Sequence, residues 1–229
     1  MWIYGHRGSS GTAPENTKRA FAAALAAGAD GVEFDVRATA DGVPVILHDR
    51  GLERTTSRLG NVDELTFDQV RAFDAGQGEQ VPTLAETLDL VAGRLRLDLE
   101  MKQAGIEREV LTILGRYKEA TWAISSFDWE ILRTVHELDR GAPLWPLAVR
   151  TDEALFAVAR ELAAPAVALA AAVVDGDVAE RCRAAGLAIM VWTVNEVEEA
   201  RRVRDLGAAA LCTDFPEAIQ AGLDGRGSP

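Results

Sequence analysis

Residues 31–47 read Gly-Val-Glu-Phe-Asp-Val-Arg-Ala-Thr-Ala-Asp-Gly-Val-Pro-Val-Ile-Leu, and this stretch decides how many strands the fold contains. Two apolar runs, 31–36 and 43–47, are separated by only six residues, which include Asp41 and Gly42. Asp-Gly between two apolar runs predicts a tight turn, and six residues cannot hold a crossover helix. We therefore expect 43–47 to be a return strand rather than part of a parallel barrel.

On both sides of this stretch, short β-branched runs alternate with alanine-rich amphipathic segments, a rhythm typical of βα units and a parallel sheet. The other predicted strands are residues 2–5, 95–100, 121–125, 144–149, 166–169, 187–192 and 209–212. The predicted helices are residues 17–27, 84–91, 106–117, 129–138, 152–162, 178–185 and 196–206. Without the return strand eight βα units remain, at about 29 residues each, which is enough for an α/β fold of the (β/α)8 TIM-barrel type.

We expect a single barrel domain over residues 1–222, followed by a tail at 223–229. A small insertion, at about 49–82, would follow barrel strand 2 and lie over one end of the barrel. The alternative is an open doubly wound sheet, but neither a GxGxxG motif nor a P-loop accompanies the first strand.

Composition excludes several classes of protein. With 48% hydrophobic and 26% charged residues among 229, the chain is expected to be a packed soluble protein rather than a disordered or fibrous one. Its 24 Lys and Arg against 36 Asp and Glu give a net charge of −12, which repels phosphate backbones and anionic lipid headgroups. We expect neither nucleic acid nor membrane insertion. No secretory signal or membrane-spanning stretch is visible, which predicts a cytoplasmic location.

Three of the predicted strands carry charged residues at their carboxyl ends, where the strands of a parallel barrel otherwise read as apolar runs. Because successive side chains of a strand point to opposite faces, acids two residues apart share one face, and we expect that face to be the barrel interior. The carboxyl ends of the strands are where TIM barrels place catalytic residues. The charged residues are His6 and Arg7, Glu33 and Asp35, and Asp98, Glu100 and Lys102.

Glu33, Asp35 and Glu100 are candidate metal ligands. Two carboxylates about 4 Å apart repel by roughly 4 kcal/mol at an effective dielectric near 20, so a cluster of three requires protonation or a cation. Donors that are all oxygen favour one hard divalent ion, Ca²⁺ or Mg²⁺ with Mn²⁺ as a further candidate, over zinc. The alternative is a buried network in which Arg or Lys pairs with each acid. Asp98 lies one layer deeper and is expected only to orient a neighbour.

His6 and His48 each directly follow a β run. A histidine with a pKa near 6.5 both accepts and donates a proton at neutral pH, so these two are candidates for an acid/base pair; the alternative is two structural histidines. His136 falls within a predicted helix and is expected to be a solvated or core residue. Cys182 and Cys212 lack metal or redox spacing and are expected to be small core residues.

Short motifs recur in one order along nearly the whole chain, from residue 5 to residue 216. Each is weak alone, but their number and order are specific, and together they resemble the glycerophosphodiester phosphodiesterase family. The region 144–177 carries little of the family's pattern. The motifs are His6-Arg7-Gly8, Pro14-Glu15-Asn16-Thr17, Glu33-Phe34-Asp35-Val36, Thr39-Ala40-Asp41-Gly42, His48-Asp49, Leu99-Glu100-Met101-Lys102, Ser125-Ser126-Phe127, Val191-Trp192-Thr193-Val194-Asn195 and Thr213-Asp214-Phe215-Pro216.

The resemblance implies a (β/α)8 barrel that hydrolyses glycerophosphodiesters, such as glycerophosphocholine, to glycerol 3-phosphate and an alcohol. It also implies a role for each matching residue. One divalent ion would be held by Glu33, Asp35 and Glu100, with His6 and His48 as the acid/base pair. Arg7 and Lys102 would contact the phosphate. Glu15 and Asn16 would belong to a motif lining the same site, and Trp192 would supply an apolar wall.

Two other functions are consistent with the same framework. A lysophospholipase D or sphingomyelinase D-like lipid phosphodiesterase would need an apolar groove and attraction to membranes, against which the charge of −12 counts. A non-catalytic phosphate-binding barrel would tolerate loss of a histidine or a metal acid, yet every such position is filled. The expected partner is a small-molecule phosphodiester; the sequence leaves open its alcohol, the metal, the nucleophile and the oligomeric state.

Overall fold

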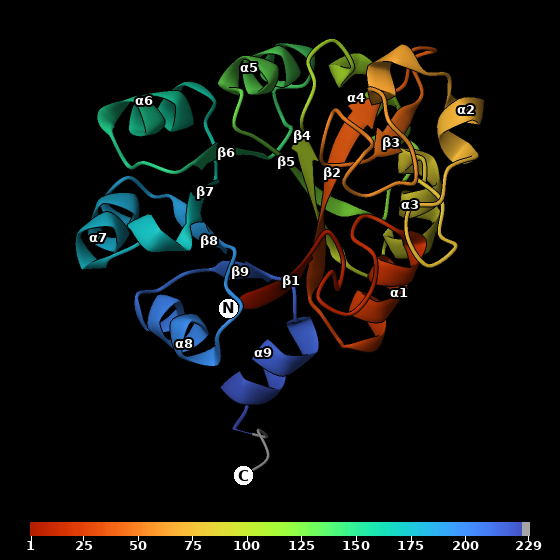
Figure 1. The fold of residues 1–229 in the computed structure, drawn as a ribbon. Helices are drawn as coiled ribbons and strands as arrows, with labels where there is room; N and C mark the ends of the chain where they lie inside the picture. The colour runs from red at the N-terminus through yellow and green to blue at the C-terminus, as the bar shows by residue number, and fades with distance from the viewer. Residues whose placement is uncertain (226–229) are drawn as a thin grey trace.

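The computed structural model of the protein describes residues 1–225, and within them eight parallel strands form a closed barrel (Figure 1). The ring closes because β1 pairs with β2 on one side and with β9 on the other. The predicted TIM barrel is therefore confirmed, and the open doubly wound sheet is excluded. The barrel strands are β1 (Trp2–His6), β2 (Gly31–Ala38), β4 (Arg96–Met101), β5 (Thr121–Ser126), β6 (Leu144–Ala148), β7 (Ala166–Ala170), β8 (Ala188–Trp192) and β9 (Ala210–Thr213).

The remaining strand, β3 (Pro44–Ile46), is the predicted return strand. It runs antiparallel to β2, with Val36 opposite Ile46 and Ala38 opposite Pro44. The turn between them needs a residue in the left-handed backbone conformation, and Gly42 adopts it with a φ of +80°. The Asp-Gly signal thus identified the hairpin correctly.

Helices form the outer layer around the strands (Figure 1). Their starts follow from the local sequence, since Thr17, Asp128, Asp152 and Asp175 each cap a helix by accepting a hydrogen bond from its first turn. Within residues 1–225, no helix is both long and apolar enough to cross a membrane. The outer helices are α1 (Lys18–Ala26), α3 (Leu84–Val91), α4 (Glu107–Leu114), α5 (Trp129–Leu138), α6 (Glu153–Glu161), α7 (Gly176–Ala184), α8 (Val197–Asp205) and α9 (Pro216–Leu223), with a 3-10 turn, η2 (Ala171–Val173), before α7.

Helix α9 was not among the predicted helices. Pro216 at its first turn is compatible with a helix start, because the missing N–H has no intrahelical partner there. The helix ends at Leu223, one residue inside the tail expected at 223–229. Most of that expected tail, residues 226–229, lies outside the described part of the chain.

The barrel has two apolar layers. Strand residues facing outward, such as Val32, Phe34 and Val36 of β2, join the helices in one large core. Side chains facing inward form a smaller cluster that fills the barrel and includes Cys212; Cys182 belongs to the outer core, so both cysteines are buried and free as predicted. The inner cluster consists of Tyr4, Leu147, Ala168, Met190, Ala210 and Cys212.

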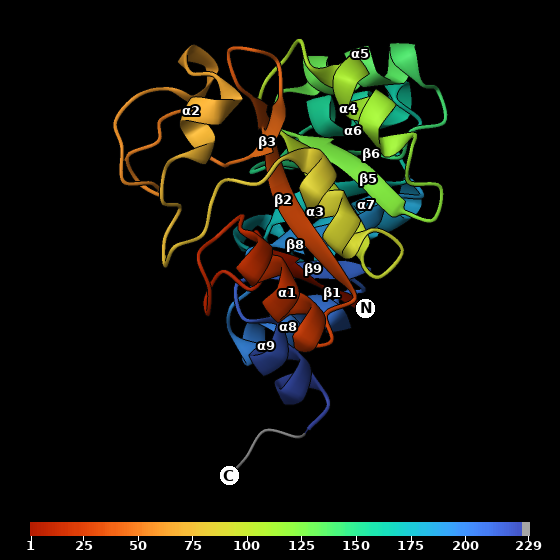
Figure 2. The same cartoon turned by 90° about the vertical axis from the view of Figure 1, so that its right-hand side faces the viewer.

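The insertion, residues 49–82, contains a 3-10 turn, η1 (Val62–Glu64), and a short helix, α2 (Phe67–Arg71), neither of which was predicted. It lies beside β3 near the carboxyl end of β2 (Figure 2). The insertion packs on a small core of its own, so it is a fixed part of the fold. That core consists of Val45, Leu47, Leu52, Val62, Val70, Ala75 and Val81.

Candidate active site

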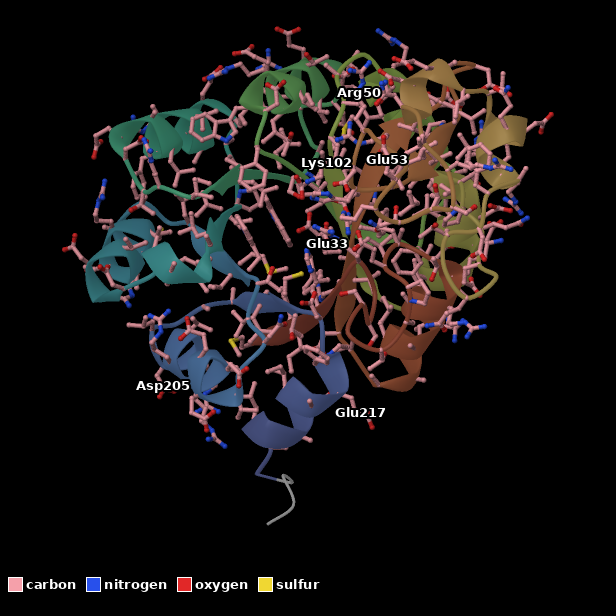
Figure 3. All side chains as sticks on the ribbon, in the orientation of Figure 1. Glu33, Arg50, Glu53, Lys102, Asp205 and Glu217 are labelled. Carbon is pink, nitrogen blue, oxygen red and sulfur yellow. The ribbon has the colours of Figure 1, made fainter. Side chains whose placement is uncertain are left out.

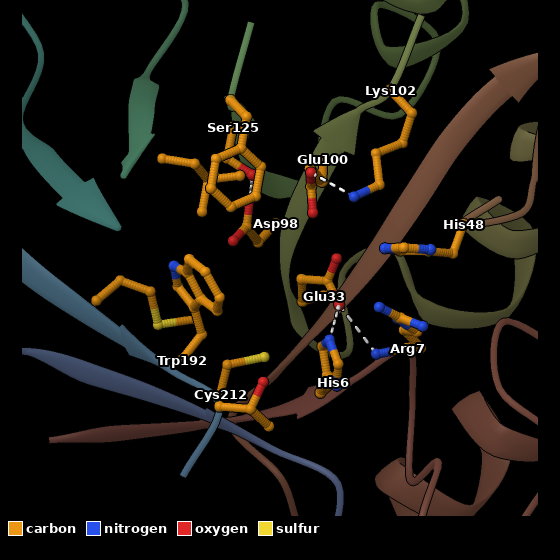
Figure 4. A pocket seen from close by; sticks show the side chains of 14 residues that line it. His6, Arg7, Glu33, His48, Asp98, Glu100, Lys102, Ser125, Trp192 and Cys212 are labelled. Carbon is orange, nitrogen blue, oxygen red and sulfur yellow. Dashed lines mark hydrogen bonds and ion pairs between the residues drawn. The ribbon is translucent and has the colours of Figure 1, made fainter. Parts of the chain in front are cut away.

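A cavity of about 130 Å³ lies inside the barrel at the carboxyl ends of the strands (Figure 4). Charged side chains reach it from β1, β2 and β4 and from the loop after β3, whereas β5, β6 and β8 contribute mainly apolar groups. Its lining residues are His6, Arg7, Glu33, His48, Asp98, Glu100, Lys102, Ser125, Phe127, Leu147, Met190, Trp192, Thr193 and Cys212.

An acidic cluster forms one wall of this site. In the β2–β4 register Glu33 lies beside Asp98 and Asp35 beside Glu100, and carboxylate oxygens of Glu33, Asp35 and Glu100 lie within 4.8 Å of one another. Figure 3 shows Glu33 and Lys102 inside the ring of strands, with Asp205 and Glu217 on the outer helices. The strand alternation therefore brings together the three acids that the sequence singled out.

The cluster has the chemistry of a cation site. Within the described residues, Oε1 of Glu33 and Oδ1 of Asp35 are buried and take part in no hydrogen bond. Burial and the neighbouring charges of Asp35 and Glu100 raise the pKa of Glu33 well above its ordinary value, and burial followed by Asp35 raises the pKa of Glu100. Buried carboxylates whose oxygens lack hydrogen bonds fit a hard divalent cation, whose positive charge offsets both their burial and their repulsion.

Two cationic side chains flank the acids. The Lys102 ammonium lies 2.6 Å from Oε1 of Glu100 and 3.3 Å from Oδ1 of Asp35, and Nε of Arg7 lies 3.3 Å from Oδ2 of Asp35. The alternative pairing of acids with Arg and Lys is therefore present at Asp35 and Glu100, whereas Oε1 of Glu33 accepts no hydrogen bond from the described residues. Because Arg7 and Lys102 both line the cavity, their positive charges also face any bound anion.

The backbone around Arg7 explains why it points into the cavity. Arg7 has a positive φ of 54°, and its N–H donates to Oε2 of Glu33 at 3.0 Å. Gly8 follows with a φ of +83°, and a Cβ there would lie 2.6 Å from the backbone of Ala20 in α1. The loop after β1 therefore packs directly against α1, which fixes the entry angle of the arginine.

Glu15 and Asn16 support the site from behind rather than line the cavity. Oε1 of Glu15 accepts a hydrogen bond from Nη1 of Arg7 at 2.7 Å. The Asn16 amide donates to Oδ2 of Asp35 at 2.7 Å. Glu15 therefore orients Arg7, and Asn16 orients Asp35.

His6 is oriented by a residue from the opposite end of the chain. Its Nδ1 lies 2.7 Å from Oδ1 of Asp214, which also accepts from Ser10, while Asn195 donates to Oδ2 of Asp214. Burial raises the pKa of Asp214, but these hydrogen bonds outweigh burial and hold it at about 2. Since an ionised carboxylate accepts from Nδ1–H, Nε2 is left as the acceptor facing the acids, 4.0 Å from Oε2 of Glu33.

His48 is oriented in a similar way, by its neighbour in the chain. Its Nδ1 lies 2.5 Å from Oδ1 of Asp49, and its carbonyl accepts from Nε of Arg37 at 2.8 Å. Burial lowers the pKa of His48, which favours the neutral imidazole. Both histidines thus have Nδ1 bound by a carboxylate while their rings line the same cavity.

The far wall of the cavity is mainly apolar. Trp192 and Phe127 meet edge to face with ring centroids 5.4 Å apart, and Leu147 and Met190 lie beside them in the lining. Asp98 lies deeper and accepts from the Ser125 hydroxyl at 2.6 Å, as expected of an orienting residue. Burial raises the pKa of Asp98 to about 7.

Sequence reasoning gave Asp49 and Asp214 no role beyond their place in two motifs, and the structure shows that they orient the two imidazoles. A signal for both was present, since Asp214 directly follows β9 and Asp49 directly follows a histidine at a strand end. The rule that exposed the acids, a polar residue at the carboxyl end of a barrel strand, would also have found Asp214.

Two carboxylate-bound histidines, two cations and an acidic cluster share one mouth of this TIM barrel, the end at which enzymes of this fold carry their catalytic groups. A model of the glycerophosphoryl diester phosphodiesterase family matches residues 6–218. The chain belongs to this family.

Related sequences match this chain over almost its full length. The chain is 31% identical to the glycerophosphodiester phosphodiesterase of Caldanaerobacter subterraneus, covering 95% of each chain, and 32% identical to that of Bacillus altitudinis, covering 94% of this chain and 95% of the relative.

Among solved structures, a phosphodiesterase of Oleispira antarctica, in complex with the product sn-glycerol-3-phosphate, matches with a TM-score of 0.93 and 28% identity over 98% of this chain and 97% of that one. The glycerophosphodiester phosphodiesterase of Thermotoga maritima matches with a TM-score of 0.85 and 27% identity over 96% and 97% of the two chains.

Proposed function

We propose that this protein hydrolyses glycerophosphodiesters to glycerol 3-phosphate and an alcohol, with one divalent cation and with His6 and His48 as its acid/base pair. The family assignment and the product bound in the Oleispira antarctica neighbour support the substrate class. The observation that carries the roles is that both histidines, each with Nδ1 bound by a carboxylate, line the same cavity as the acidic cluster.

The cation would be held by Glu33, Asp35 and Glu100, whose oxygens already converge. When bound, such an ion supplies positive charge that offsets the negative charge of the phosphodiester and of the transition state. Ca²⁺, Mg²⁺ and Mn²⁺ all accept carboxylate ligands. Burial and the charge of Asp35 raise the pKa values of Glu33 and Glu100, so protons would compete with the cation, and cation binding should strengthen as the pH rises.

Arg7 and Lys102 would bind the phosphate from the same side. Both are held by acids of the cluster, so their positions are fixed before substrate arrives. A guanidinium offers two parallel N–H donors to a phosphate, and an ammonium offers a compact point charge. The two cations would orient the phosphodiester and share its charge.

The histidines would move the protons of the reaction. One imidazole removes a proton from the nucleophile through its free Nε2 as the new P–O bond forms, and the other, as imidazolium, donates a proton to the departing alkoxide as the old P–O bond breaks. The nucleophile is water or the neighbouring glycerol hydroxyl; with the hydroxyl, a cyclic phosphate forms first and water then opens it. Asp214 and Asp49 would stabilise the imidazolium forms.

The rival lipid phosphodiesterase function has less support. The relatives named above are glycerophosphodiester phosphodiesterases, and the apolar part of the cavity lining is confined to a few side chains inside a cavity of about 130 Å³. A non-catalytic barrel is also disfavoured, because each histidine has the carboxylate partner that a proton-transfer group needs.

The test measures release of glycerol 3-phosphate from glycerophosphocholine. The released glycerol 3-phosphate is detected by its oxidation in a coupled dehydrogenase assay. We expect turnover that disappears after chelation and returns with a divalent ion. We also expect His6→Ala and His48→Ala each to lower kcat by about 10² to 10⁴-fold, the range that general acid–base groups contribute.

His136→Ala is the matched control, because His136 lies on α5, outside the cavity lining, and should keep wild-type turnover. Near wild-type kcat in either cavity variant would remove that histidine from the acid/base pair. Full activity of the chelated enzyme would remove the cation from the proposal.

A further inference from the structure

Arg54 connects the insertion to two carboxylates beside the site. Its Nη1 and Nη2 donate to Oε2 and Oε1 of Glu15 at 2.6 and 2.8 Å, and its Nε donates to Oδ2 of Asp49 at 2.5 Å. All three guanidinium nitrogens are thus engaged by acids. The two-pronged contact to Glu15 defines the plane of the guanidinium, and Asp49 lies at its third nitrogen.

Each of these carboxylates is also bound to a residue of the cavity. Oδ1 of Asp49 lies 2.5 Å from Nδ1 of His48, and Oε1 of Glu15 accepts from Nη1 of Arg7. The contacts therefore run without a break from Arg7 through Glu15, Arg54 and Asp49 to His48. Glu15 comes from the loop after β1, so this element anchors the arginine that holds Asp49.

The base of Arg54 is fixed as well as its tip. Leu52, two residues earlier, is fully buried in the core of the insertion, and the N–H and hydroxyl of Thr56 both donate to the Leu52 carbonyl. Between the insertion and Glu15, Asn16 and His48 there is a cavity of only about 10 Å³, room for at most one water molecule. The insertion thus packs closely against this side of the site.

We infer that Arg54 is a positioning residue, which holds the carboxylate of Asp49 so that Asp49 in turn fixes the imidazole of His48. This inference rests on the role proposed above for His48. Asp49 is about one-third exposed and follows His48 directly in the chain, so without Arg54 its carboxylate is free to turn toward solvent. A misplaced imidazole transfers protons poorly even when substrate binds normally.

Arg50 provides a matched control within the same insertion. Its side chain is 57% exposed and pairs with Asp63 at 3.0 Å, while that of Arg54 is 47% exposed. Neither Asp63 nor Glu64, its other ion-pair partner, lines the cavity. Exposed ion pairs contribute little to stability, so Arg50→Ala and Arg54→Ala should both fold, and only the second should affect turnover.

The experiment measures kcat, KM and melting temperature for Arg54→Ala, Arg54→Lys, Asp49→Asn and the double variant Asp49→Asn with Arg54→Ala. We expect Arg54→Ala to lower kcat by about 10- to 100-fold, the usual cost of losing an outer-layer partner, with KM within about threefold. The kcat of Arg54→Lys should lie between those of the wild type and Arg54→Ala, because the lysine keeps the positive charge but one ammonium cannot make the forked contact. The double variant should be within about threefold of the worse single variant, because both changes break the same chain of contacts.

A folded Arg54→Ala with kcat within twofold of wild type would overturn the inference, and so would losses that multiply in the double variant. If Arg54→Ala does not fold, Arg54→Lys carries the same comparison, and failure of both to fold would mean a structural role only. These outcomes can be told apart from a failure of the proposed function, because His48→Ala tests the acid/base role of His48 without reference to Arg54.

Discussion

The two halves of the barrel mouth differ in kind. On the half formed by β1, β2 and β4, every strand ends in charged side chains that hold one another, from the acidic cluster to Arg7 and Lys102. On the half formed by β5, β6 and β8, the cavity is lined mainly by Phe127, Leu147 and Trp192. In the proposed function, the first half would bind and transform the phosphodiester, and the second would provide surface for the rest of the substrate.

The two halves therefore differ in how well they tolerate substitution. A buried charge without a partner is costly, so moving one side chain of the charged half disturbs several others. An apolar wall tolerates exchange of side chains of similar volume. We therefore expect substitutions in the charged half to remove catalysis and substitutions in the apolar half to change affinity.

The largest effect is expected from the acidic cluster. Glu33→Gln with Asp35→Asn keeps the shape of both side chains but removes two of the three converging charges. Calorimetry should then detect no tight divalent binding, and turnover should fall by at least about 10³-fold, because a fixed electrostatic contribution to the transition state is lost. Asp205→Asn with Glu217→Gln, on the outer helices, is the control (Figure 3). Undiminished affinity in the cluster variant would remove these acids as ligands.

An intermediate effect is expected from Asp214. In Asp214→Asn the His6 ring loses the carboxylate that selects its tautomer, so kcat should fall by about 10²-fold with KM little changed. Ser10→Ala removes only one hydrogen bond to the same carboxylate and should cost a few-fold. Steady-state kinetics on folded variants checks both. Asp214→Asn with kcat within threefold of wild type would show that His6 needs no partner.

The smallest effect is expected in the apolar half. Trp192→Ala removes an aromatic side chain from the apolar wall of the cavity, together with its edge-to-face contact with Phe127. Because the substrate then has less apolar surface to contact, KM should rise by about two- to tenfold at nearly constant kcat. Trp192→Phe should restore most of the affinity. A large fall in kcat without a change in KM would place Trp192 with the catalytic residues. It would contradict the expectation that the apolar half affects only affinity.

Sequence patterns predicted the barrel well because its signals are local. All nine predicted strands are present with ends within about two residues, and the hairpin of β2 and β3 follows from Asp41-Gly42. Helices α2 and α9 were missed: α2 is only five residues long, and α9 begins at Pro216, close behind the last strand. Short elements depend on packing that no local pattern contains.

The site was predictable where strand alternation determines it. Glu33, Asp35 and Glu100 converge because parallel strands in register carry them on the same face. Asp214 could be found as a polar residue at the end of β9, but its pairing with His6, 208 positions away in the chain, depends on the closure of the ring between β9 and β1. Arg54 lies in an irregular loop, where position depends on tertiary contacts alone.

The closure of the ring between β1 and β9 has a consequence for biosynthesis. His6 precedes Asp214 by 208 positions in the chain, and the contact between them forms only when β9 seats against β1. During synthesis the imidazole therefore leaves the ribosome long before its carboxylate partner. In the proposed mechanism, the acid/base pair would be complete only after the last strand of the barrel has been made and has closed the ring.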